Sequence, residues 1–176
     1  SLDESAKRVL EEIKRLAKED LDELKRVLDE IKEILREVLE ANRDSVRRIE
    51  EEVEKLARVD DERTVKRLED EAKRILDDNR RKSERVAREL ERLLEELKRH
   101  SEDVLKKLKD LLRELKEEGV DDRVLEEIER VIRKIEEDSR RLLKEIADVI
   151  KKVREESKRL LDDLKRVIDE LRERAR

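Results

Sequence analysis

The chain has 176 residues, of which 59% are charged, and its formal net charge is −5 because 49 Lys and Arg residues are set against 54 Asp and Glu residues. Phe, Tyr, Trp, Met, Cys and Pro are absent. Because the chain has no cysteine, disulfides, thiolate nucleophiles and cysteine-bound metals are excluded. The two signs of charge are interspersed and no apolar run approaches a membrane span, so we expect a soluble chain, cytoplasmic when expressed, with no nucleic-acid or membrane partner.

The first predicted helix covers residues 2–58. Its apolar residues return every 18 positions, as do Leu10, Leu28 and Val46. Eighteen residues make about five turns of a straight α-helix, so the apolar stripe stays on one face without the supercoil of a heptad repeat. The stripe loses phase near Val59, where the tripeptide Val59-Asp60-Asp61 offers an aspartate to cap the next helix.

The second and third predicted helices cover residues 61–117 and 121–175. The same 18-residue repeat relates Leu76, Leu94 and Leu112 in one and Ile128, Ile146 and Leu164 in the other. Between them lies the lone glycine, Gly119, which can adopt the left-handed conformation that ends a helix, followed by a second Val-Asp-Asp tripeptide.

Both connections are short, so successive helices are expected to run antiparallel. The sequence therefore predicts an all-α fold, an antiparallel up-down-up three-helix bundle of long, nearly straight helices, which forms a single domain over residues 1–176. Two neighbouring helices cover the apolar stripe of each helix in such a bundle.

Polar residues interrupt the apolar stripes at positions that fall into two levels of the antiparallel register. A buried polar group without a partner costs about 1–3 kcal/mol, so we expect the members of each level to hydrogen-bond to one another. They would form two buried networks that fix the register, because an 18-residue repeat otherwise tolerates a slide of one repeat. The predicted layers are, first, Asn42, Ser45, Asn79, Ser83 and Ser157, and second, Asp20, His100, Ser101 and Ser139.

His100, with Asp20 and either Ser101 or Ser139, has the residue types of a Ser-His-Asp relay. A relay also needs an oxyanion hole and a substrate cavity, which a closed aliphatic core without glycine loops does not offer. We therefore expect no catalytic residues and no enzyme activity, and we favour a partly buried imidazole bonded to Asp20 or Ser139 over a solvated one. Leu97 stands where the Glu-x-x-His motif of bundle metal sites requires glutamate, so neither a metal nor another cofactor is expected.

The charge-rich surface, the Leu/Ile/Val core, the Val-Asp-Asp connections and the Asn/Ser/His layers resemble computationally designed (de novo) helical bundles with buried hydrogen-bond networks. The resemblance covers the whole chain and is one of style rather than of a sequence motif. It implies a synthetic, stable scaffold with no natural substrate or activity and no required partner. The alternative is a designed interaction module, either the three-helix half of a helical heterodimer or a homo-oligomer subunit. Leu16 and Ile34 favour this alternative because they widen the stripe of the first helix into an apolar edge.

Overall fold

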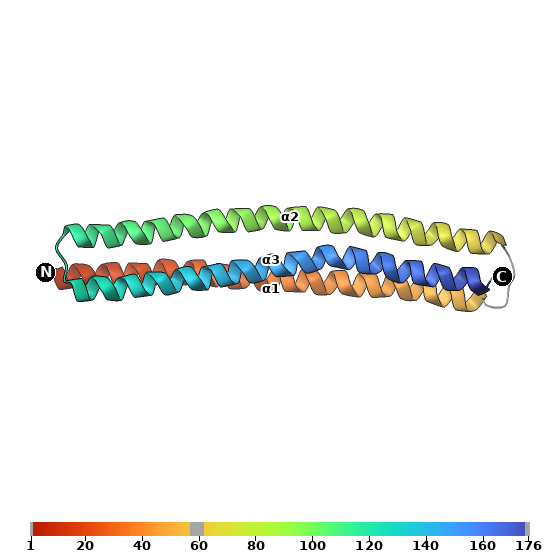
Figure 1. Cartoon of the computed structure of the whole chain (residues 1–176), viewed down its shortest axis with the longest axis horizontal. Coiled ribbons are helices and arrows are strands. Elements are labelled where there is room, and N and C mark those ends of the chain that lie inside the picture. The colour runs from red at the N-terminus through yellow and green to blue at the C-terminus, as the bar shows by residue number, and fades with distance from the viewer. Residues whose placement is uncertain (1, 57–61, 175–176) are drawn as a thin grey trace. The chain divides into compact units, whose positions relative to one another are not determined.

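The computed structural model of the chain describes residues 2–56 and 62–174, which form three helices (Figure 1). They are α1 (Leu2–Leu56), α2 (Glu62–Glu117) and α3 (Asp122–Arg174). The predicted all-α fold with three packed helices is confirmed. The predicted break at Val59 and its aspartate cap lie outside the described residues. None of the described helices is both long enough and apolar enough to cross a membrane.

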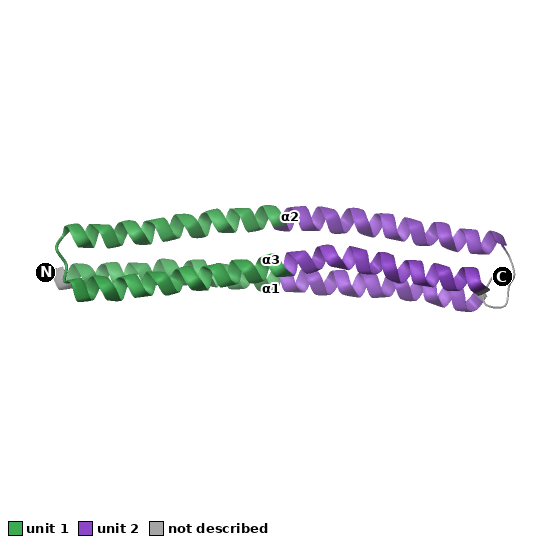
Figure 2. Cartoon of the chain, in the orientation of Figure 1, with its two compact units in different colours: residues 1–30, 91–148 green, residues 31–90, 149–176 purple. Residues whose placement is uncertain are grey.

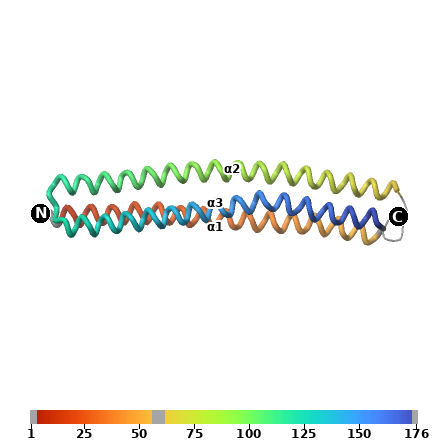
Figure 3. The backbone as a smooth tube through the Cα atoms, in the orientation of Figure 1, coloured from red at the N-terminus to blue at the C-terminus, as the bar shows by residue number. Residues whose placement is uncertain are grey.

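The contacts between helices divide the chain into two compact units (Figure 2). Unit 1 comprises residues 1–30 and 91–148, and unit 2 comprises residues 31–90 and 149–176. Each unit contains one segment of every helix, and within each unit α2 runs antiparallel to α1 and α3, as Figure 3 shows. The contacts define each unit separately, so the single domain over residues 1–176 stays a prediction.

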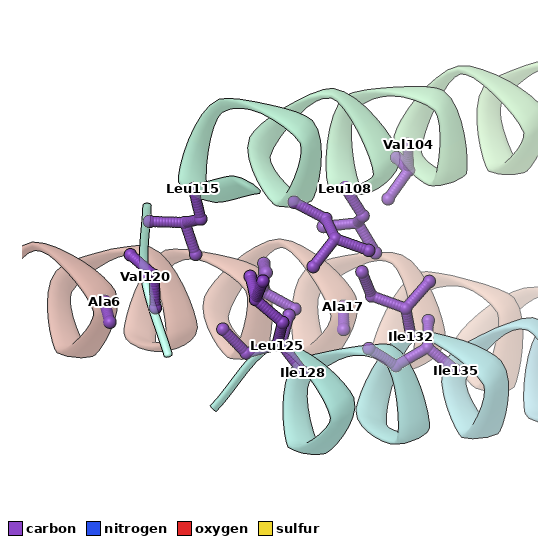
Figure 4. Packing of buried hydrophobic residues seen from close by; sticks show 12 residues of the cluster. Ala6, Ala17, Val104, Leu108, Leu115, Val120, Leu125, Ile128, Ile132 and Ile135 are labelled. Atoms are coloured by element: carbon purple, nitrogen blue, oxygen red, sulfur yellow. The ribbon is translucent and has the colours of Figure 1, made fainter. Parts of the chain in front are cut away.

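The core of unit 1 is a stack of aliphatic side chains from all three helices. Ile13 of α1, Leu108 of α2 and Ile128 of α3 each have an exposed fraction of 0%. Figure 4 shows the side chains of α2 and α3 in this cluster pointing toward one another across the helices. Complete burial of a Leu or Ile side chain contributes about 1.5–3 kcal/mol, so this stack supplies most of the stabilisation of the unit.

Unit 2 has a core of the same kind. Ile49 from α1, Leu68 from α2 and Leu160 from α3 are each only 1% exposed and belong to one cluster. The 18-residue repeat identified these positions well: in α3, the register that contains Ile146 and Leu164 is buried at every occurrence. The apolar stripe therefore marks the packed face in both units.

The connection from α2 to α3 is fixed by its backbone. Gly119 has a φ of 81°, and the amide of Val120 donates to the carbonyl of Leu115 at 3.2 Å. This is the bonding pattern of a glycine-terminated helix, in which the residue after the glycine packs against the last turn. The side chain of Asp121 then accepts a hydrogen bond from the amide of Arg123 at 3.2 Å, so the predicted glycine stop and aspartate cap are both confirmed here.

Candidate functional site

Asp20 in unit 1 lies at the centre of one predicted layer. Its side chain projects from α1 into the core and is only 4% exposed. The hydroxyl of Ser101 on α2 donates toward its two carboxylate oxygens at 3.4 and 3.3 Å, and the hydroxyl of Ser139 on α3 donates to Oδ2 at 3.5 Å. Both serines are buried. One carboxylate thus receives a hydroxyl group from each of the other two helices.

The environment of this carboxylate favours its protonated form. Burial raises the pKa of Asp20 above its ordinary value, while the hydroxyl of Ser101, the positive charge of His100 and the hydroxyl of Ser139 lower it without cancelling the effect of burial. Strong hydrogen bonds from hydroxyls to carboxylates measure about 2.5–2.7 Å, so the two serine contacts are long. Asp20 is therefore a buried acid whose hydrogen bonds to neighbouring side chains are weak.

His100 lies at the rim of this layer and not within it. Its side chain is 56% exposed, and Nε2 is 3.9 Å from Oδ1 of Asp20, which is an ion-pair distance and too long for a hydrogen bond. The expectation of a partly buried imidazole bonded to Asp20 or Ser139 was therefore wrong. His100 is displaced by one residue from the stripe position of Ser101, and one residue turns a helix by about 100°, which carries the ring toward solvent.

The order of the groups differs from that of a Ser-His-Asp relay. In a relay the imidazole lies between the hydroxyl and the carboxylate and bonds to both. Here the hydroxyls of Ser101 and Ser139 donate directly to Asp20. Among the residues that the structure describes, no three His, Asp or Glu side chains converge on a point where they could hold a metal ion.

The second predicted layer, in unit 2, is centred on two asparagines. Nδ2 of Asn79 on α2 donates to Oδ1 of Asn42 on α1, and the hydroxyl of Ser83 donates to Oδ1 of Asn79 at 3.3 Å. Asn42 and Ser83 are each 5% exposed, whereas Asn79 is half-buried. Nδ2 of Asn42 is buried without a hydrogen-bond partner among the described residues. Three of the five predicted members are thus linked in one chain of hydrogen bonds.

The other two predicted members of this layer do not join that chain of bonds. The hydroxyl of Ser45 donates to the carbonyl of Ala41 on its own helix at 2.9 Å. This local bond competes with contacts to other helices, as is common for helical serine. Ser157 on α3 is half-buried and lines a groove together with Ser83.

One polar contact between helices was not predicted. Glu52 of α1 faces Glu71 of α2 in unit 2, and the pKa of Glu52 is raised, first by burial and then by the negative charge of Glu71. Oε2 of Glu52 is buried and has no hydrogen-bond partner in the described part of the chain. The sequence did indicate that Glu52 is partly buried, because Glu52 occupies the 18-residue register of Leu16 and Ile34, at the edge of the apolar stripe.

Comparisons with known proteins give no function for this chain. No protein-family model matches the chain, and no curated protein sequence matches it. A solved structure described as a "Computationally designed three helix bundle" is similar to this chain, with 19% sequence identity and a TM-score of 0.38. The similarity covers 99% of this chain and 86% of that chain. Function must therefore be inferred from the contacts within this chain.

Proposed function

We propose that the chain is a de novo designed structural scaffold, a stable three-helix bundle whose two polar layers fix the register of its helices. It has no natural biochemical activity and requires no partner. The observation that carries this proposal is the hydrogen bond from Asn79 on α2 to Asn42 on α1. Asn42 is buried and Asn79 is half-buried. A pair of this kind contributes less to stability than apolar packing would and more to the choice of one arrangement.

The Asn42–Asn79 pair discriminates between registers that hydrophobic packing alone would accept. A slide of one 18-residue repeat returns apolar residues to apolar positions. In the direction that puts Ser83 in the place of Ser101, a hydroxyl could also still donate to Asp20. The asparagines have no such substitute, because Leu97 stands one repeat after Asn79. A slide in that direction would move Asn79 away from Asn42 and into the place of Leu97, whereas a slide in the opposite direction would place Leu97 opposite Asn42. Either slide leaves a buried amide unpaired, at a cost of about 1–3 kcal/mol.

Replacement of the layer by apolar residues tests this role. The variant carries Asn42→Leu, Asn79→Leu, Ser83→Ala and Ser157→Ala. Since these changes remove the penalty for slipped arrangements, we expect more than one set of amide resonances in NMR spectra, or additional species in chromatography with light scattering, while helix content is kept. A matched control, Ser45→Ala, removes a hydroxyl that bonds only to its own helix and should leave a single species.

A variant that keeps one set of resonances and the molar mass of the parent chain would show that the layer does not specify the register. The scaffold would then derive its order from the aliphatic core alone.

A second candidate function, the designed interaction module, is favoured by one feature of α1. Ile34, Leu35, Val38 and Leu39 are each only partly buried in unit 2. They form two adjacent pairs, 34/35 and 38/39, and the pairs are three to five residues apart along one side of the helix. Together they form an apolar edge to which a helix of another chain could pack.

A dye that fluoresces on exposed apolar surface distinguishes the two candidates. Strong binding that is lost in the Ile34→Lys, Val38→Lys variant would favour the interaction module. Absence of binding by the parent chain would favour the closed scaffold.

A further inference from the structure

A groove of about 420 Å³ lies between α2 and α3 in unit 2, and one of its lining residues, Ser83, donates to Asn79. Ser83 and Ser157, one from each helix, line it. Four cations surround these serines, namely Arg80, Lys151, Arg154 and Lys158, and two carboxylates, Glu84 and Glu155, accompany them. The groove therefore combines neutral hydroxyl groups with an excess of positive charge.

The two hydroxyls are suited to donate to a bound group. Ser157 is half-buried, and its hydroxyl has no hydrogen-bond partner among the described residues. Ser83 is 5% exposed, and its bond to Asn79 is long at 3.3 Å, so this hydroxyl can turn to another acceptor at small cost. A serine hydroxyl rotates freely and donates one proton, so both groups can point at an anion that enters the groove.

Three of the four cations at the rim are not held in ion pairs with carboxylates. Arg80, Lys151 and Lys158 make no ion pair within the part of the chain that the structure describes. A second groove of about 220 Å³ in the same unit, between α1 and α3, differs in this respect, because its three arginines are matched by three carboxylates. The excess charge is thus a property of the serine-lined groove, and screening beyond about 8–10 Å keeps the net negative charge of the chain from cancelling it.

We propose that this groove binds a small, multiply charged oxyanion of the phosphate or pyrophosphate class. Phosphate oxygens accept hydrogen bonds from hydroxyls and form charge-assisted bonds with guanidinium and ammonium groups. Ser83 and Ser157 bond to the oxygens that lie deepest, while Arg80, Lys151 and Lys158 neutralise the charge from two sides. Such a ligand would join α2 to α3 next to the polar layer.

Titration of the ¹⁵N-labelled full chain with sodium pyrophosphate, at a constant ionic strength of about 0.15 M, tests the proposal. We expect saturable shifts of the amide resonances of the residues that line the groove. Because Ser157→Ala removes a donor to a charged acceptor, it should weaken binding about tenfold. Lys151→Gln should weaken it about two- to fivefold, as expected for one partly exposed charge pair. Neither variant removes a contact of the folded chain, so helix content should not change.

Lys152→Gln is the matched control, because Lys152 has the same charge, is exposed on α3 and does not line the groove. It should bind pyrophosphate as the parent chain does. The proposal is overturned if the shifts do not saturate, if sodium chloride of equal ionic strength reproduces them, or if Lys152→Gln weakens binding as much as Lys151→Gln. Each of these results would indicate diffuse attraction to surface cations.

Discussion

Replacement of Asp20 by asparagine should stabilise the bundle at neutral pH. The amide has nearly the shape of the carboxylate but carries no charge, so the change removes the cost of burying an anion. Oδ1 of the asparagine can still accept a hydrogen bond from Ser101, and its amide group can donate to the oxygen of Ser139. The variant thus keeps a polar layer of three helices without its charge.

The size of the effect follows from the contacts around Asp20. A well-formed hydrogen bond to a charged group contributes about 1.5–3 kcal/mol, and burial of a carboxylate costs several kcal/mol. The serine bonds of 3.3–3.5 Å are too long to reach that range, and the raised pKa of Asp20 shows that burial dominates. We therefore expect Asp20→Asn to increase the free energy of unfolding by about 1–3 kcal/mol at pH 7.

The dependence on pH provides the control. A carboxyl group whose pKa is higher in the folded state stabilises the fold when it is protonated, and this contribution is lost as the pH rises through the folded pKa. The advantage of the variant should therefore shrink on acidification and vanish near pH 4, at the ordinary carboxyl pKa. Denaturant titrations followed by the circular dichroism of the helices at pH 4 and pH 7 measure it. Equal stability at pH 7, or destabilisation by the variant, would refute the reasoning.

Four further changes have defined outcomes in the same assay. His100→Ala should destabilise the fold by less than about 1 kcal/mol, because the imidazole is exposed and lies 3.9 Å from the carboxylate of Asp20. Asn79→Leu should cost about 1–3 kcal/mol, because Oδ1 of Asn42 loses its donor. Glu52→Gln should stabilise the fold slightly, by less than about 1 kcal/mol, at pH 7 and not at pH 4, since burial and a neighbouring carboxylate raise the pKa of Glu52. Gly119→Ala should cost about 1 kcal/mol from backbone strain alone, because nothing lies within 4 Å of the added carbon.

The helices and their packed faces could be predicted because the buried residues are apolar and recur in the sequence with the period of the helix. The register of Ile146 and Leu164 repeats every 18 residues, and each member is buried because a straight helix returns the same face after about five turns. The end of α2 at Gly119 could also be predicted, since glycine adopts the left-handed conformation more readily than any other residue. The division of contacts into two units was not predicted, because every helix runs through both.

The levels of the polar residues were predictable, whereas their individual bonds were not. Counting along antiparallel helices brought Asp20 level with Ser101 and Ser139, because every residue advances a helix by the same 1.5 Å. A level does not fix a side-chain direction: His100 is turned toward solvent, and Ser45 bonds to its own helix.

A scaffold of the proposed kind requires that one chain forms a complete three-helix bundle by itself. Chromatography with light scattering measures this directly, through the molar mass of the species in dilute solution. We expect a single species of 21.3 kDa, which is the mass of one chain. A species whose mass is a multiple of that value would contradict the scaffold proposal and assign the apolar edge of α1 to an interface between chains.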